Sequence, residues 1–315
     1  MTVRSLRLAT VAVVVALILA GCSAPSRSGG SSDAGTATGG SAAPVSAGPG
    51  MAVLGTENFY ADLLSQIGGQ RVAAMSLLND PNTDPHAFEA SPKAAVTVAD
   101  AKLVIVNGLG YDGFMQKLLG ASTKPARVVI SVQELLGLKD DVNAHVWYDP
   151  ATMPKVAEAA AAALTKLDPQ NAAYFAGRKA SYLASLRPID EKIGQLKAKY
   201  AGFPVAFTEP VAEYLTDAIG LTVLTPKGFQ EAVEQGVEPS PADVAAARDL
   251  LTGKKVKVLL YNSQVTSPLT QGIQDLAKKN GVPVVGVAET IPPGFRTFQE
   301  WMLAQLKELE QALAK

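Results

Sequence analysis

Short apolar runs alternate with amphipathic segments along residues 51–131. Apolar runs of about four to eight residues are typical of buried strands, whereas apolar positions three or four residues apart are typical of helices. The run from Lys102 to Asn107 is continuous, which suits a parallel strand buried on both faces. In chain order the pattern predicts strand 51–56, helix 59–67, strand 72–78, a helix that begins at Ser91 and Pro92, strand 102–107, helix 111–119 and strand 127–131.

A long helical segment separates this region from a second one with the same alternation. An aspartate and a proline, Asp168 and Pro169, are typical of a helix start, and a helix over 168–200 would measure about 45 Å at about 1.5 Å per residue. In chain order the pattern predicts helix 152–167, helix 168–200, strand 203–208, helix 211–219, strand 221–224, a loop to Glu238, helix 241–252, strand 255–261, helix 268–280, strand 282–287 and helix 297–313.

This order of elements indicates the fold class. Strands that alternate with helices are typical of parallel sheets covered by helices. We therefore predict an α/β fold of two lobes, each a parallel sheet with flanking helices, joined by one long rigid helix. The N-terminal lobe would comprise residues 51–167, the linking helix residues 168–200 and the C-terminal lobe residues 201–315.

The first fifty residues have a different pattern. Arg4 and Arg7 precede an uncharged apolar stretch that is too short to span a bilayer comfortably and has the length of a signal peptide, which we assign to residues 1–21. The stretch ends in Leu-Ala-Gly-Cys, which resembles the lipobox of bacterial lipoproteins, with Cys22 as the acylated residue. Residues 22–50 are rich in Ser and Gly and predict a flexible, disordered tether.

This N-terminus predicts a cellular location. The order of charge, apolar run, small residues and cysteine favours an extracytoplasmic lipoprotein held in the membrane through Cys22. The alternative is a cytosolic protein with an apolar N-terminal helix and an incidental cysteine. The anchor is compatible with both the periplasmic side of a membrane and the outer surface of a cell.

Composition narrows the function further. The formal net charge is −1, and no basic patch favours binding to nucleic acid. Cys22 is the sole cysteine, so the chain has no internal disulfide and no Cys-rich zinc site. Function must therefore depend on particular polar residues.

Four such residues follow strands or stand in the loops between strands and helices. They are His86, His145, Glu209 and Glu289, two from each half of the chain, and the two histidines are the only ones present. Ligands in open α/β sheets bind outside the carboxyl ends of the strands, so we expect these side chains to converge. Two imidazoles and two carboxylates suit a divalent transition metal ion.

Each residue also has a simpler interpretation. A loop histidine is more often a surface or capping residue than a ligand, and Glu209 and Glu289 could form ion pairs with Lys227 or Arg296.

Polar residues that neighbour these four positions also have more than one possible role. The side chains after the first strand could line the cleft between the lobes or cap the next helix, and capping is the simpler role; they are Glu57, Asn58 and Tyr60. Asn107 and Tyr111 could instead orient an imidazole. The segment from Tyr261 to Gln264 could hydrogen-bond Glu209 or Glu289, or simply turn the chain.

Several segments resemble one known family, the solute-binding proteins of zinc and manganese ABC importers. The segment 82–92 (NTDPHAFEASP) resembles the family's first ligand motif, and 145–150 (HVWYDP) resembles its second. Segments 99–110 and 238–243 resemble a strand and a C-lobe landmark of the same family, and the resemblance covers about residues 51–313.

The resemblance implies a two-lobed protein that binds one metal ion between its lobes. The ion would be Zn²⁺ or Mn²⁺, carried as transported substrate and delivered to the ABC permease of a metal importer. Many relatives have histidine where this chain has Glu209, and aspartate where it has Glu289. Two histidines with two carboxylates are the manganese-type set, but zinc accepts carboxylates and forms the stronger complexes.

We thus expect a monomeric, non-enzymatic metal carrier. Two other functions are the alternatives. A metal-dependent hydrolase would need an open water position, and the chain lacks a His-Glu-x-x-His helix. An adhesin-type surface lipoprotein, a role sometimes attached to the family, has no sequence feature in its favour.

Overall fold

The computed structural model describes residues 50–80 and 88–315. Its first sheet has four parallel strands in the order β2-β1-β3-β4. The strands are β1 (Met51–Glu57), β2 (Val72–Leu78), β3 (Leu103–Val106) and β4 (Val128–Ser131). The helices that connect or follow them are α1 (Asn58–Gly68), α2 (Pro92–Asp100), α3 (Phe114–Ala121) and α4 (Val132–Leu136).

The second sheet repeats this arrangement with the strand order β6-β5-β7-β8, again all parallel. Its strands are β5 (Pro204–Phe207), β6 (Thr222–Val223), β7 (Val258–Asn262) and β8 (Val284–Val287). The helices of this region are α7 (Glu213–Ile219), α8 (Lys227–Glu234), α9 (Pro241–Thr252) and α10 (Pro268–Lys279).

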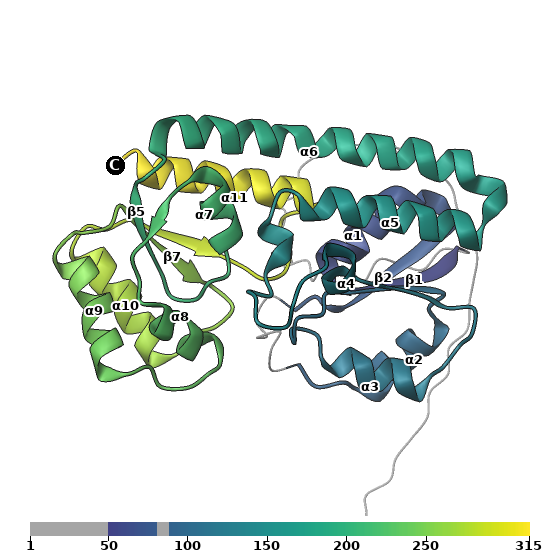
Figure 1. Cartoon of the computed structure of the whole chain (residues 1–315), viewed down its shortest axis with the longest axis horizontal. Helices are drawn as coiled ribbons and strands as arrows, with labels where there is room; N and C mark the ends of the chain where they lie inside the picture. The colour runs from purple at the N-terminus through teal and green to yellow at the C-terminus, as the bar shows by residue number, and fades with distance from the viewer. Residues whose placement is uncertain (1–49, 81–87) are drawn as a thin grey trace, which may run out of the picture. The chain divides into compact units, whose positions relative to one another are not determined.

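Three long helices complete the fold: α5 (Thr152–Leu167), α6 (Ala172–Tyr200) and α11 (Phe298–Leu313). The 29-residue helix α6 packs against both α5 and α11 (Figure 1). The predicted α/β fold of two parallel sheets joined through a long helix is therefore confirmed. We call the first sheet with its helices the N-lobe and the second sheet with its helices the C-lobe.

Both sheets are covered by helices on two faces. In the N-lobe, Leu54 and Val104 pack with side chains of α2 and α3, whereas Val53 and Leu103 face the larger core with α1. Successive residues of a strand point to opposite faces, so these continuous apolar strands are buried on both sides. The larger core includes apolar residues of both lobes, and the smaller clusters fill the outer faces of the sheets.

The structure corrects three predicted elements. The expected loop before Glu238 contains helix α8, whose buried Phe229 and Val233 lie four residues apart, a helical spacing that the sequence prediction overlooked. Helix α4 was not predicted, because five residues are too short to show one. Helix α3 begins at Phe114 instead of residue 111, since a hydrogen-bonded turn occupies residues 109–113.

That turn is held by one carboxylate. Asp112 accepts hydrogen bonds from the backbone N–H groups of Asn107 (2.8 Å) and Gly108 (2.9 Å). Gly108, Leu109 and Gly110 all have φ between 57° and 80°, which is a left-handed conformation. The chain therefore cannot enter a helix until after this turn.

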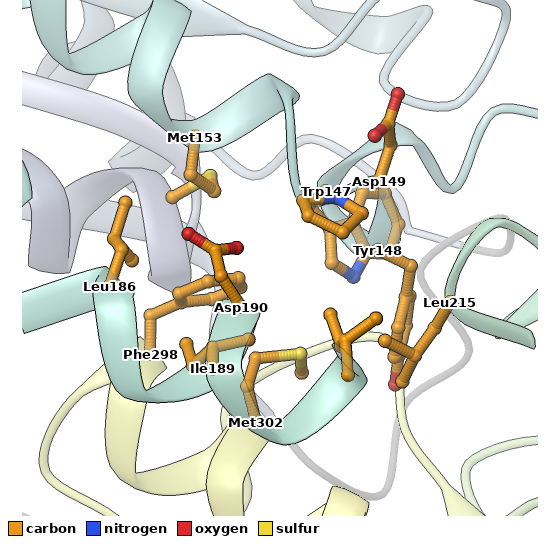
Figure 2. A pocket seen from close by; sticks show the side chains of 12 residues that line it. Trp147, Tyr148, Asp149, Met153, Leu186, Ile189, Asp190, Leu215, Phe298 and Met302 are labelled. Carbon is orange, nitrogen blue, oxygen red and sulfur yellow. The ribbon is translucent and has the colours of Figure 1, made fainter. Parts of the chain in front are cut away.

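A small pocket lies where α6 and α11 meet the loop around Trp147. It measures about 20 Å³, roughly the space of one water molecule. Its lining is mainly apolar, with Leu186 lying across from Leu215 in Figure 2. Such a lining offers few metal ligands.

No helix of the described residues is long and apolar enough to cross a membrane. The predicted signal peptide, Cys22 and the tether lie outside the described residues, apart from Gly50.

Candidate metal centre

His145 is completely buried at the end of a loop that leads into a short 3₁₀ turn, Val146–Tyr148. Its ring contacts the edges or faces of Trp147 and Tyr111, with centroid distances of 5.2 and 5.8 Å. Aromatic packing on two sides restricts the orientation of the imidazole. The two ring nitrogens have different surroundings: Nδ1 lies 2.7 Å from Asn143 Oδ1, and Nε2 lies 3.3 Å from Glu289 Oε2.

The two predicted carboxylates come from strand ends of the C-lobe. Glu209 lies two residues after β5 and Glu289 two residues after β8, and both are buried. Strand β7 lies between β5 and β8 in the sheet and ends at Asn262. Asn262 Nδ2 donates to Glu209 Oε2 (2.9 Å) and to Glu289 Oε1 (2.7 Å), so one amide fixes the positions of both carboxylates.

Further hydrogen bonds fix Glu289. The Tyr111 hydroxyl of the N-lobe donates to Glu289 Oε2 over 2.9 Å. Gln264 Oε1 accepts the backbone N–H groups of Glu289 and Thr290, which holds the backbone of this loop. Of the two possible roles of the 261–264 segment, the structure thus shows the hydrogen bond to the carboxylates, made by Asn262. Tyr111 contacts Glu289 as well as the His145 ring.

The structure brings three of the four predicted ligands into one region. His145 is next to Glu289, and Asn262 links Glu289 to Glu209. His86 lies outside the described residues. Within residues 50–80 and 88–315, no three His, Cys, Asp or Glu side chains are close enough together to form a metal site. The described part of the chain thus contains His145, Glu209 and Glu289 of the predicted ligand set, and the fourth ligand, His86, lies outside it.

The alternative ion-pair partners lie elsewhere. Lys227 Nζ pairs with Glu231 (3.3 Å), and the Arg296 guanidinium pairs with Glu300 (3.1 Å). Both pairs span four residues along a chain segment at the surface. Among the described residues these two cations therefore pair with Glu231 and Glu300 and not with Glu209 or Glu289, which removes the simplest alternative for the carboxylates.

The side chains after β1 do not cap α1, which corrects the simpler interpretation of these residues. Asn58 instead bonds the backbone of Ile291 through both its Nδ2 and its Oδ1, which links α1 to the loop after Glu289. The Tyr60 hydroxyl donates to Asn107 Oδ1 over 2.8 Å. Glu57 is completely buried, and desolvation, with the negative charge of Asp112 second, raises its pKa well above the usual range.

Two site residues were not identified from the sequence. Glu234 at the end of α8 has its Oε1 3.7 Å from His145 Nδ1, and it was missed because α8 was not predicted. Asn143 contacts both the backbone N–H and the ring Nδ1 of His145. Its position two residues before a predicted ligand is the signal that could have identified it.

Comparison with known proteins assigns the chain to a family. Residues 53–312 match the model of a family described as the periplasmic component A of a zinc-uptake complex. The chain belongs to this family. The predicted family resemblance is therefore confirmed, over nearly the whole described region.

Individual members of the family are distant relatives. A manganese-binding lipoprotein of Halalkalibacterium halodurans is 28% identical over 58% of this chain and 57% of its own length. One from Bacillus subtilis is 26% identical over 73% of this chain and 77% of its own length. The structure of a periplasmic zinc-binding protein from Treponema pallidum has the same fold, with a TM-score of 0.71, 20% identity, and coverage of 84% of this chain and 99% of that one.

Proposed function

We propose that this protein is the extracytoplasmic binding component of an ABC importer and carries one divalent transition metal ion. The ion is its cargo, bound by His86 and His145 from the N-terminal half and by Glu209 and Glu289 from the C-terminal half. Membership of the zinc-uptake family supports the class of function, and the contacts around His145 and Glu289 support the place of the site.

One observation carries the proposal: His145 Nε2 and Glu289 Oε2 lie 3.3 Å apart, and both side chains are completely buried. A neutral imidazole nitrogen and a carboxylate oxygen both present lone pairs, and two ligand atoms of one ion at about 2.0–2.2 Å from it lie at about this separation. The same pair holds a proton when the imidazole is charged, so proton and metal compete for one position.

The carboxylates make the site suitable for a hard or borderline cation. Asn262 keeps two carboxylates at fixed positions, which limits the rearrangement needed when an ion binds. Oxygen ligands favour manganese, and imidazole nitrogen is accepted by both zinc and manganese. We therefore propose Mn²⁺ or Zn²⁺ as cargo, and a Glu209→His variant as the means to distinguish them.

The proposed role is that of a carrier without catalytic activity. Two imidazoles and two carboxylates complete a four-ligand shell, whereas a hydrolytic site needs one position for an activated water. We further propose a lipid anchor at Cys22, an extracytoplasmic location, a monomeric state and a metal-importer permease as the partner. Lipoprotein relatives in Halalkalibacterium halodurans and Bacillus subtilis support the anchor.

Native mass spectrometry and calorimetry of the protein loaded with Zn²⁺ or Mn²⁺ test the proposal. One bound ion per chain is expected for the wild type, with loss of binding in Glu289→Gln. Glu308→Gln is a matched control, because Glu308 is exposed on α11. Failure of the wild type to bind either ion would refute the carrier function, and unchanged binding by Glu289→Gln would refute the site.

A further inference from the structure

Asn143 uses every hydrogen-bonding position of its side chain. Its Oδ1 accepts from the backbone N–H of His145 (2.9 Å) and faces His145 Nδ1 at 2.7 Å. Its Nδ2 donates to the Pro210 carbonyl (2.7 Å) and to Glu213 Oε2 (2.9 Å). An amide has two lone pairs and two N–H groups, so this side chain is saturated.

These partners fix the orientation of the amide. A backbone carbonyl and a carboxylate can only accept, so the atom that faces Pro210 and Glu213 must be the nitrogen. The backbone N–H of His145 can only donate, so the atom that faces it must be the oxygen. Because Oδ1 is an acceptor, His145 Nδ1 must carry the proton that lies between them.

This assignment has a direct consequence for the imidazole. A neutral imidazole with its proton on Nδ1 has its lone pair on Nε2. Nε2 is the nitrogen that faces Glu289 Oε2. The tautomer held by Asn143 is thus the one that offers a ligand atom toward the carboxylate of the C-lobe.

The other end of the amide reaches the C-lobe. Pro210 directly follows Glu209, and Glu213 opens α7. A second contact runs in the same direction, since the Tyr214 hydroxyl donates to the Asn143 carbonyl over 2.9 Å. One residue thus contacts the backbone beside His145 and the backbone beside Glu209, although 67 positions separate Asn143 from Pro210.

We propose that Asn143 is a positioning residue with two functions: it holds His145 in the Nδ1–H tautomer, and it ties this histidine to the loop that carries Glu209. The effect on the cargo ion rests on the proposed function. The tautomer of His145 does not rest on the proposed function, because it is a property of the protein without metal.

Nitrogen-15 NMR of the histidine rings in the metal-free full chain tests the first function. The chain has two histidines, so the His86→Ala variant assigns the signals of His145. At about pH 9, where an imidazole is neutral, the wild type should show Nδ1 as the protonated nitrogen. Asn143→Leu, or Asn143→Ala if the larger residue prevents folding, should give a mixture of the two tautomers, because Glu234 Oε1, at 3.7 Å from Nδ1, is too distant for a hydrogen bond that holds this proton.

Either of two NMR results would overturn the role of Asn143 in setting the tautomer. A wild-type His145 protonated on Nε2, or an unchanged Nδ1–H tautomer in the Asn143→Leu or Asn143→Ala protein, would show that Asn143 does not set the tautomer. Asn171→Leu is the control, because the Asn171 amide also bonds a neighbouring side chain, Asp168, but lies far along the chain at the start of α6.

Asn143→Asp separates the second function from the first. The new carboxylate still accepts from Nδ1–H but cannot donate to the Pro210 carbonyl, and it meets the negative charge of Glu213. The tautomer should therefore stay as in the wild type, while affinity for Zn²⁺ or Mn²⁺ falls about tenfold, the lower end of the effect expected for residues that support metal ligands.

A second substitution provides a rescue. Adding Glu213→Gln to Asn143→Asp supplies an N–H donor opposite the new carboxylate, so part of the lost affinity should return. No loss in Asn143→Asp, or no recovery in the double variant, would overturn the tie to the C-lobe. A wild type that binds neither ion would instead refute the proposed function and leave the tautomer result standing.

Discussion

The two lobes have the same strand order but supply their proposed ligands in different ways. In the C-lobe, Glu209 and Glu289 lie two residues beyond the ends of β5 and β8, and Asn262 lies at the end of the strand between them. In the N-lobe, His145 lies 14 residues after the end of β4, beyond α4 and a loop. Its orientation depends on contacts with Asn143, Tyr111 and Trp147.

The difference indicates two ways to preorganise a metal site. Strand ends are fixed by the hydrogen bonds of the sheet, so the carboxylates need few further contacts. Asn262 bridges the two, and Tyr111 and Gln264 bond the side chain and the backbone of Glu289. A histidine in a long loop needs side-chain contacts on several sides. We therefore expect substitution of Asn262 to disturb both C-lobe ligands together. Substitution of Asn143 or Tyr111 should disturb His145 and, through their bonds to Pro210 and Glu289, the C-lobe side of the site as well.

The largest effect is expected when an N-lobe ligand is removed. His145→Ala and His86→Ala should each weaken ion binding by more than about 100-fold, beyond the usual range for residues that only support a ligand. Calorimetry with Zn²⁺ and Mn²⁺ measures the affinities, and circular dichroism checks the fold. A loss below about threefold in either variant would remove that histidine from the site.

A smaller effect is expected when the support of the carboxylates is removed. Asn262→Leu takes away the donors to Glu209 Oε2 and Glu289 Oε1, so affinity should fall about 10- to 100-fold. Asn171→Leu serves as the control. Wild-type affinity in Asn262→Leu would show that the bridging amide is not needed to position the carboxylates.

Exchange of one C-lobe carboxylate for an imidazole should change the preference between ions. Glu209→His replaces an oxygen ligand by nitrogen, which zinc accepts better than manganese, so the ratio of the two affinities should move toward zinc by roughly tenfold. Competition between the two ions for the metal-free protein measures this ratio. An unchanged ratio would count against Glu209 as a ligand.

The smallest effect is expected at Glu234. Its side chain is 19% exposed and its carboxylate is near His145, so it adds negative potential beside the site. Glu234→Gln should slow ion association about two- to threefold at low salt, with the difference reduced at high salt. Stopped-flow fluorescence can follow binding because Trp147 contacts the His145 ring. A salt-independent change would contradict this role, and Glu308→Gln is the control.

Much of the fold could be predicted because buried strands have a strong local signal. Apolar runs such as 102–107 and 72–78 and proline-marked helix starts such as Ser91–Pro92 correspond to β3, β2 and α2. Helix α8 has a weaker local signal, because its eight residues contain one apolar repeat, from Phe229 to Val233, and both side chains pack in the C-lobe core. Short elements depend on tertiary contacts that a local pattern does not contain.

The site was predictable only in part for a related reason. Topology alone suggests that Glu209 and Glu289 converge, since parallel strands end at the same edge of a sheet. The contacts of Asn143 with Pro210 and Glu213 join residues about 70 positions apart, and no sequence spacing predicts them. The assignment of His86 stays a prediction, because this residue lies outside the described part of the chain.

The most direct test of the central claim is anomalous diffraction from crystals of the protein grown with one equivalent of Zn²⁺ or Mn²⁺. The account predicts a single strong peak at the absorption edge of the bound metal, about 2.0–2.3 Å from both His145 Nε2 and a carboxylate oxygen of Glu289. A peak that contacts His145 through Nδ1, or a peak away from both residues, would contradict it.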